Sequence, residues 1–302
     1  MNNIPQEQNL QRRLELLAAQ RQLYSDAKNL QIISVIISVP VVIAWSILVA
    51  LFPTLAVYAA LWGIIATFLE LLVFSRLQKS TQEKAAKIQQ IFDCEVLQFN
   101  WASLNCGVRV ERETIIDASN RYKRKNLNFI QQLQDWYPIS VGQLPIHQAR
   151  IICQRSNVWW DAQLRRSYSK WIIIILLSLT VIVSLIGLIG GLTFEKFLLA
   201  ILVPLIPAFV FGLRQYTEHN EAATRLDRLR ENAEVLFEQV ISRRYTTQDL
   251  ERESYSLQTQ IYDNRRRSPL ILDWLYSRLR NKDEEQMNKG AESLVQELTQ
   301  NP

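Results

Sequence analysis

The sequence has few of the residues that build metal sites, disulfide frameworks and tight turns. Its 302 residues include three cysteines, two histidines, eight glycines and nine prolines. The cysteines are odd in number and widely spaced, which fits neither a disulfide framework nor a metal site. The histidines lie far apart without a nearby ligand pattern. Because no P-loop, dinucleotide fingerprint or nucleophile elbow occurs either, we expect no enzyme activity and no cofactor.

Charge is missing from three long stretches, and these predict membrane-spanning helices. Residues 29–69 carry no charged side chain over 41 positions, residues 171–194 over 24 and residues 197–213 over 17. A helix needs about 20 apolar residues to cross a hydrocarbon core of roughly 30 Å, so the first stretch is long enough for two crossings. Pro53 supplies a break in its middle. The predicted spans lie near 31–52, 55–74, 171–191 and 197–213.

Basic residues flank the same ends of all four predicted spans, and this asymmetry predicts their orientation. They are Lys28, Arg76, Lys79, Arg165, Arg166, Lys170 and Arg214. We therefore expect both termini and the segment between the hairpins to face the cytoplasm. The polar first thirty residues do not resemble a cleaved signal peptide, so the first span should stay in the membrane.

The predicted fold class is an all-α membrane protein, with four transmembrane helices as two hairpins and a mainly helical cytoplasmic body. Apolar residues from Leu226 to Val240 step by three and four and predict a short coiled-coil-like seam. Thr246-Thr247 can cap a further helix that ends near Asn264. The expected parts are a cytoplasmic amphipathic helix (1–30), transmembrane hairpin 1 (31–75), a cytoplasmic domain (76–170), transmembrane hairpin 2 (171–213) and a cytoplasmic helical tail (214–302).

Two adjacent tryptophans, Trp159 and Trp160, lie too far from the bilayer to act as membrane anchors. If Trp171 marks the membrane edge, Trp160 lies about 16 Å away along a helix that rises 1.5 Å per residue. The headgroup zone is only about 5 to 8 Å deep on each side. The pair therefore belongs to the cytoplasmic body, where it either fills the core or stacks on a planar ligand.

Basic residues alternate with aromatic ones in several segments of the expected body. Arginine offers paired hydrogen bonds to phosphate and aromatic rings offer faces to bases, so these segments could bind a small phosphorylated nucleotide. A solvated helix face or attraction to anionic lipid would explain the same clusters. The candidate ligand-binding residues are Arg121, Lys123, Arg124, Arg155, Trp159, Trp160, Arg265 and Arg266.

Small residues, two prolines and one acid stand out within the predicted spans. Small residues at steps of three and four favour close helix packing, with a pore-lining face as the alternative. The prolines should kink the fourth helix, as a gate or merely as a bend. An acid in a span is a functional candidate because carboxylates are costly in lipid. The candidate pore or packing residues are Glu70, Thr180, Ser184, Gly187, Gly191, Pro204 and Pro207.

Five segments carry a likeness to a known family. They are IPQEQN at 4–9, IFD at 91–93 with NW at 100–101, DWYP at 135–138, CQRSNVWWDAQLRRSY at 153–168 and RRRSPLILDWLY at 265–276. With these segments and the spacing of its hairpins, the chain resembles the SMODS-associated four-transmembrane effector family over almost its whole length. The resemblance implies an effector of bacterial anti-phage systems that signal with cyclic oligonucleotides.

On this resemblance, a cytoplasmic body detects a cyclic nucleotide made during infection. The transmembrane helices then form or open a pore in the bacterial inner membrane, and the infected cell dies. The expected partners are the lipid bilayer, the cyclic nucleotide second messenger and further copies of the chain in a homo-oligomer, with no long nucleic acid.

Two other functions stay open. A non-conducting membrane scaffold or adaptor would dock a cytoplasmic partner through the helical tail and would show no conductance. A small-solute transporter fits less well, because transporters usually have more polar groups at the membrane midplane than these spans contain.

Overall fold

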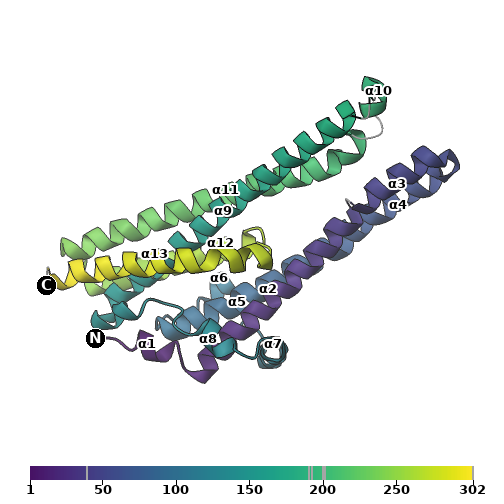
Figure 1. Cartoon of the computed structure of the whole chain (residues 1–302). Coiled ribbons are helices and arrows are strands. Elements are labelled where there is room, and N and C mark those ends of the chain that lie inside the picture. Colours follow the sequence, from purple (N-terminus) through teal and green to yellow (C-terminus); the bar gives the residue numbers. More distant parts are fainter. Residues whose placement is uncertain (39, 190, 192, 199–201, 301–302) are drawn as a thin grey trace.

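The structure is a computed structural model that describes the whole chain except residues 39, 190, 192, 199–201, 301 and 302. All regular secondary structure of the described residues is helical. Long and short helices form a body at one end, and two helical hairpins extend from it toward the other end (Figure 1). Both termini lie at the body end of the molecule.

The first hairpin continues directly out of the body. The chain begins with α1 (Ile4–Glu7) and α2 (Gln11–Ser38), continues through α3 (Pro40–Leu51) and the 3-10 turn η1 (Pro53–Leu55), and returns through α4 (Ala56–Leu69), the π-helical η2 (Glu70–Phe74) and α5 (Ser75–Val96). The first half of α2 and the second half of α5 pack in the body, while α3 and α4 form the distal end of the hairpin (Figure 1).

The second hairpin is built from the two longest helices. After α6 (Ser103–Cys106), α7 (Arg112–Lys125), α8 (Phe129–Leu133) and the 3-10 turn η3 (Ile139–Gln143), the chain forms α9 (Ile146–Ile189), α10 (Phe194–Phe197), α11 (Val203–Ile241), α12 (Thr247–Arg267) and α13 (Asp273–Gln300). α9 leaves the body and α11 returns to it, and the two pack against each other. α13 lies against α9 within the body.

Three helical stretches of the described residues are long and apolar enough to cross a membrane: Gln11–Val49, Pro53–Val96 and Ile146–Ile189. Large apolar side chains on them, such as Leu61 and Leu188, are exposed. So much exposed apolar surface is unfavourable in water and is expected in lipid. The fourth predicted span, 197–213, includes residues 199–201, which lie outside the described residues.

Each predicted domain boundary falls within a continuous helix. The boundaries after residues 30, 75, 170 and 213 lie in α2, α5, α9 and α11, respectively. The division into five parts stays a prediction, but the continuity has a mechanical consequence. A continuous helix that shifts at its body end also moves at its other end. The body and the spans are therefore coupled through α2, α5, α9 and α11.

The body has one main hydrophobic core that joins both halves of the chain. Leu17 of α2, Phe92 of α5, Ile152 of α9, Leu226 of α11 and Leu257 of α12 are all at most 2% exposed and belong to it. The seam predicted on α11 lies in this core, since its leucines and alanine are buried. The protein's own helices therefore cover the surface that an adaptor would have used for docking.

The capping prediction for α12 is confirmed. The Thr246 hydroxyl accepts a hydrogen bond from the Asp249 backbone N–H, and the Asp249 carboxylate accepts one from the Thr246 N–H. The helix ends at Arg267, three residues beyond the predicted end. Its last turn is basic, as is the last turn of α7, and cations there stabilise the negative end of a helix dipole. Part of the basic clustering thus has a structural cause.

Candidate functional site

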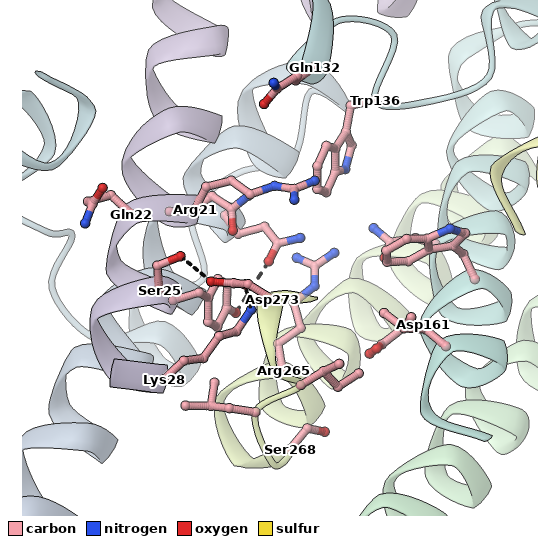
Figure 2. A pocket seen from close by; sticks show the side chains of 18 of the residues that line it. Arg21, Gln22, Ser25, Lys28, Gln132, Trp136, Asp161, Arg265, Ser268 and Asp273 are labelled. Carbon is pink, nitrogen blue, oxygen red and sulfur yellow. Dashed lines mark hydrogen bonds and ion pairs between the residues drawn. The ribbon is translucent and has the colours of Figure 1, made fainter. Parts of the chain in front are cut away.

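A cavity of about 740 Å³ lies inside the body, where helices from both hairpins meet (Figure 2). Its walls come from α2, α5, α7, α8 and the segment after it, α9, the end of α12, the α12–α13 connection and α13. This volume falls within the usual range of sites for small organic ligands, about 300–1,000 Å³.

Two indole rings line the cavity. Trp136 follows α8, and Trp160 projects from α9. The guanidinium of Arg21 lies 5.6 Å from the centroid of the Trp136 ring, a cation–π arrangement that orients both side chains (Figure 2). Tyr24 and Tyr137 add further aromatic surface. The cavity can therefore present flat apolar faces to planar groups such as nucleobases.

The lining also carries opposite charges, with five basic and four acidic side chains: Arg21, Lys28, Lys125, Arg165, Arg265, Asp135, Asp161, Asp273 and Glu284. Some of the basic groups already have partners. Arg165 pairs with Asp161 at 3.1 Å, and its Nη1 donates to the Pro269 carbonyl at 2.9 Å. The slight excess of positive charge favours an anionic ligand.

Arg265 is one of two deeply buried cations of the cavity, together with Arg165. Its side chain is only 8% exposed, and its Nη1 pairs with the carboxylate of Asp93, which is 0% exposed. Asp93 also accepts hydrogen bonds from the Tyr137 hydroxyl at 2.7 Å and from Gln258 Nε2 at 2.9 Å. Burial, reinforced by the charge of Asp93, raises the pKa of Tyr137, so this phenol stays protonated as a donor.

Several buried polar atoms of the lining have no hydrogen-bond partner among the described residues. They include Nη2 of Arg265 and the hydroxyl oxygens of Ser156 and Ser268. Both serines are 2% exposed. An unsatisfied buried polar group costs about 1–3 kcal/mol, and such groups usually mark an ion, a water or a ligand. Because all three can donate, a ligand with several acceptor oxygens, such as a phosphodiester, would satisfy them.

A buried hydrogen-bond network runs from the cavity to α9. Gln258 of α12 donates to Gln90 of α5 at 2.9 Å, and Gln154 of α9 donates to Gln258 at 3.1 Å. Gln154 also exchanges hydrogen bonds with Ser254 of α12. Gln258 also donates to the Asp93 carboxylate, which pairs with Arg265. The buried ion pair is therefore linked to one helix of each hairpin, α5 and α9.

The structure brings two of the eight candidate ligand residues, Trp160 and Arg265, into the cavity. The other six do not line it. Three of them join elements of the body: Arg121 pairs with Asp26 at 2.7 Å, Lys123 with Glu15 at 2.7 Å and Arg155 with Glu234 at 3.0 Å. Arg266 pairs with Asp263 at 2.8 Å within α12. Arg124 is exposed on α7, and Trp159 is half-buried on α9.

Other cavity residues were not predicted, among them Arg21, Trp136, Ser156 and Ser268. A signal for three of them was present in the sequence. The segments that carry the family likeness supply Asp93, Trp136, Tyr137, Ser156, Trp160, Arg265 and Ser268. These segments are far apart in the chain, and the fold gathers them around one cavity and its supporting ion pair.

The candidate residues of the spans differ in their surroundings: one is hydrogen-bonded, one lies at a close helix contact and three are exposed. Glu70 opens the π-helical turn η2 and accepts a hydrogen bond from the Ser34 hydroxyl of α2. A Cβ on Gly187 would lie 2.5 Å from a ring carbon of Phe197 in α10, so this glycine allows close packing. Thr180, Ser184 and Gly191 are exposed.

The predicted proline kink lies at the edge of the described residues. Pro204 and Pro207 fall in the first two turns of α11, which begins at Val203. A proline at the second position of a helix removes an N–H that has no helical partner there. The kink and the pore-lining roles stay predictions.

Buried His219 of α11 gives a prediction about acid stability. It is 0% exposed, and burial, with a smaller effect of Arg165, lowers its pKa from 6.5 to about 2. The unfolded chain therefore binds a proton below about pH 6.5 that the folded chain does not. Between about pH 7.5 and about 5.5, His219 alone should lower the unfolding free energy by about 1.4 kcal/mol.

Thermal unfolding in detergent at both pH values measures this loss. The His219→Gln protein should lose less stability on acidification than the parent protein. The His147→Gln protein is the matched control, since His147 is less buried. Equal acid sensitivity of the His219→Gln and parent proteins would contradict the assignment.

Comparison with known proteins agrees with the likeness seen in the sequence. A family model described as the SMODS-associating 4TM effector domain matches residues 2–294. A relative from Bacillus cereus (strain VD146), described as a probable CBASS effector molecule, is 26% identical over 298 residues, which cover 93% of this chain and 95% of the relative. No solved structure matches the chain.

Proposed function

The chain belongs to the SMODS-associating 4TM effector family, as its sequence predicted, and on this premise we propose that it is a membrane effector of bacterial anti-phage defence. Its cytoplasmic body senses a cyclic oligonucleotide, and its four transmembrane helices then form or open a pore. The pore disrupts the inner membrane and kills the infected cell. The chain itself catalyses no reaction in this scheme.

The cavity is the observation that carries this proposal. It combines two indole faces, a buried arginine and unpartnered hydroxyl groups in one space of about 740 Å³. Indoles suit bases, while the guanidinium and hydroxyls suit the phosphates that join them. An apolar metabolite would leave these polar atoms unsatisfied, and a long nucleic acid would not fit inside the body.

The position of the cavity supports a link between ligand and membrane. α2 and α9 both line it, and each continues into a span. A ligand can shift the packing of these helices only if it binds the open arrangement more tightly than the closed one. A tenfold preference supplies about 1.4 kcal/mol per site, so a homo-oligomer with several sites would respond more strongly.

A dye-release assay tests the proposal. The full chain is inserted into liposomes that contain a self-quenched dye, and a panel of cyclic di- and trinucleotides is added from the side of the body. At least one compound should release the dye, and linear nucleotides of the same bases should not. Retention of the dye with every compound, by protein shown to be inserted, would contradict pore formation.

The adaptor function is the second candidate, and the structure gives it less support. Its expected docking seam on α11 is buried in the core. An adaptor would be recovered from membranes together with a soluble partner and would leave liposomes intact. Pull-down and dye release on the same preparation therefore separate the two functions.

The proposed orientation places residues 76–170 and both termini in the cytoplasm. Single cysteines introduced at exposed Leu104 and exposed Leu127 should react with a membrane-impermeant thiol reagent only after the inner membrane is opened. The native cysteines are buried and should contribute little background. Labelling of these sites in intact spheroplasts would contradict the orientation.

A further inference from the structure

At the rim of the cavity, two residues of α2 hold a carboxylate that belongs to α13. The Ser25 hydroxyl donates a hydrogen bond to Asp273 at 2.7 Å, and the Lys28 ammonium forms an ion pair with the other oxygen of the same carboxylate (Figure 2). The Lys28 side chain is 12% exposed, whereas that of Asp273 is 56% exposed. A largely buried cation thus faces an anion that solvent can reach.

We propose that Ser25 and Lys28 form a subsite for one phosphate of the ligand, and that Asp273 occupies this subsite until the ligand displaces it. This inference rests on the proposed function and assigns a place to one part of the nucleotide. A hydroxyl and an ammonium that together hold two oxygens of a carboxylate can hold two oxygens of a phosphodiester in the same way.

Charge balance favours this exchange. A phosphodiester carries one negative charge, as the Asp273 carboxylate does, so Lys28 keeps a counter-charge when one replaces the other. Loss of Asp273 without a replacement would take a paired carboxylate away from a largely buried ammonium, which is unfavourable. The subsite therefore stays closed without the ligand and opens when a phosphate arrives.

Asp273 lies where a contact between α2 and α13 joins the two hairpins. Asp273 is the first residue of α13, which packs against α9 of the second hairpin. Its contacts with Ser25 and Lys28 therefore connect α2, which leads into the first hairpin, to a helix packed on the second. Displacement of Asp273 removes this connection, and the two hairpins can then change their relative packing.

Two substitutions and a matched control test the subsite. Each full-length protein is placed in lipid nanodiscs, and its affinity for the same panel of cyclic di- and trinucleotides is measured by calorimetric titration. Asp273→Asn removes the competing charge and should bind the active compound about three- to tenfold more tightly. Lys28→Gln should bind it at least about tenfold more weakly. Asp263→Asn, which disrupts an acid–arginine pair outside the cavity, should bind within about twofold of the parent protein.

The outcomes separate this inference from the proposed function. If the parent protein binds a compound and Asp273→Asn binds it equally or more weakly, Asp273 is not a competitor and the subsite proposal is wrong. If no protein in the set binds any compound, the proposed function fails and the subsite proposal fails with it.

A disulfide provides a second readout, in which the oxidised and reduced forms of one protein are compared. The Ser25→Cys/Asp273→Cys protein should form a disulfide that holds α13 against α2. The oxidised protein should retain dye at a ligand concentration that releases it from parent liposomes, and reduction should restore release. Equal release before and after reduction would overturn the proposed displacement of α13.

Discussion

Replacing Asp93 with asparagine should cause the largest loss of stability of any single substitution that conserves side-chain volume in the body. The carboxylate is 0% exposed and is the ion-pair partner of Arg265, which is itself buried. Asparagine keeps the shape but removes the charge, so the guanidinium is left uncompensated. Removing one partner of a buried pair typically costs about 3–5 kcal/mol, which corresponds to a fall of roughly 10 °C in the unfolding temperature.

Thermal unfolding of the purified protein in detergent measures this effect, and two further variants identify its cause. Asp263→Asn disrupts a partly exposed pair with Arg266 and should have little effect, because surface pairs contribute about 0–1 kcal/mol. Asp93→Asn/Arg265→Gln should be more stable than Asp93→Asn alone, since no unpaired charge remains. Equal stability of Asp93→Asn and the parent protein would show that this pair does not support the body.

The second large effect should be on ligand binding, after removal of the indole rings from the cavity. Stacking of a base on an aromatic side chain contributes about 1–3 kcal/mol, which is about 5- to 150-fold in affinity. Trp160→Ala should weaken binding of the active cyclic nucleotide within this range. Trp136→Ala/Trp160→Ala should weaken it by at least about 25-fold if each ring stacks on a base.

Trp159→Ala is the matched control, because Trp159 is the adjacent residue of α9 and does not line the cavity. It should leave the affinity within about twofold of the parent value. Calorimetric titration of the proteins in nanodiscs measures all the values, and circular dichroism checks that each variant is folded. A similar loss for Trp159→Ala and Trp160→Ala would indicate a general effect of truncation on α9 and would contradict stacking in this cavity.

The broad architecture could be predicted from the sequence because it depends on local properties. Absence of charge from residues 29–69 and 171–194 is enough to predict spans, since lipid excludes charge along the whole length of a helix. The cap at Thr246 depends on neighbours three residues apart. The placement of Trp160 in the body followed from helix rise alone. Each of these arguments needs only the residues of one helix.

The composition of the cavity could not be predicted, because it depends on contacts between distant segments. Arg121 and Arg265 lie in basic clusters that look alike in the sequence. In the fold, Arg121 pairs with Asp26 on the outside of α2, and Arg265 pairs with buried Asp93. Trp159 and Trp160 differ by one position on α9, a rotation of about 100°, and that rotation decides which ring lines the cavity.

The central claim is that occupancy of the cavity opens a path through the membrane. Recording the current across a planar bilayer that contains the full chain, before and after addition of the active cyclic nucleotide, tests it most directly. We expect discrete current steps with the parent protein, and none with Trp136→Ala/Trp160→Ala at the same ligand concentration. A parent protein that binds the nucleotide without any current, or a double variant that conducts as the parent does, would contradict the account.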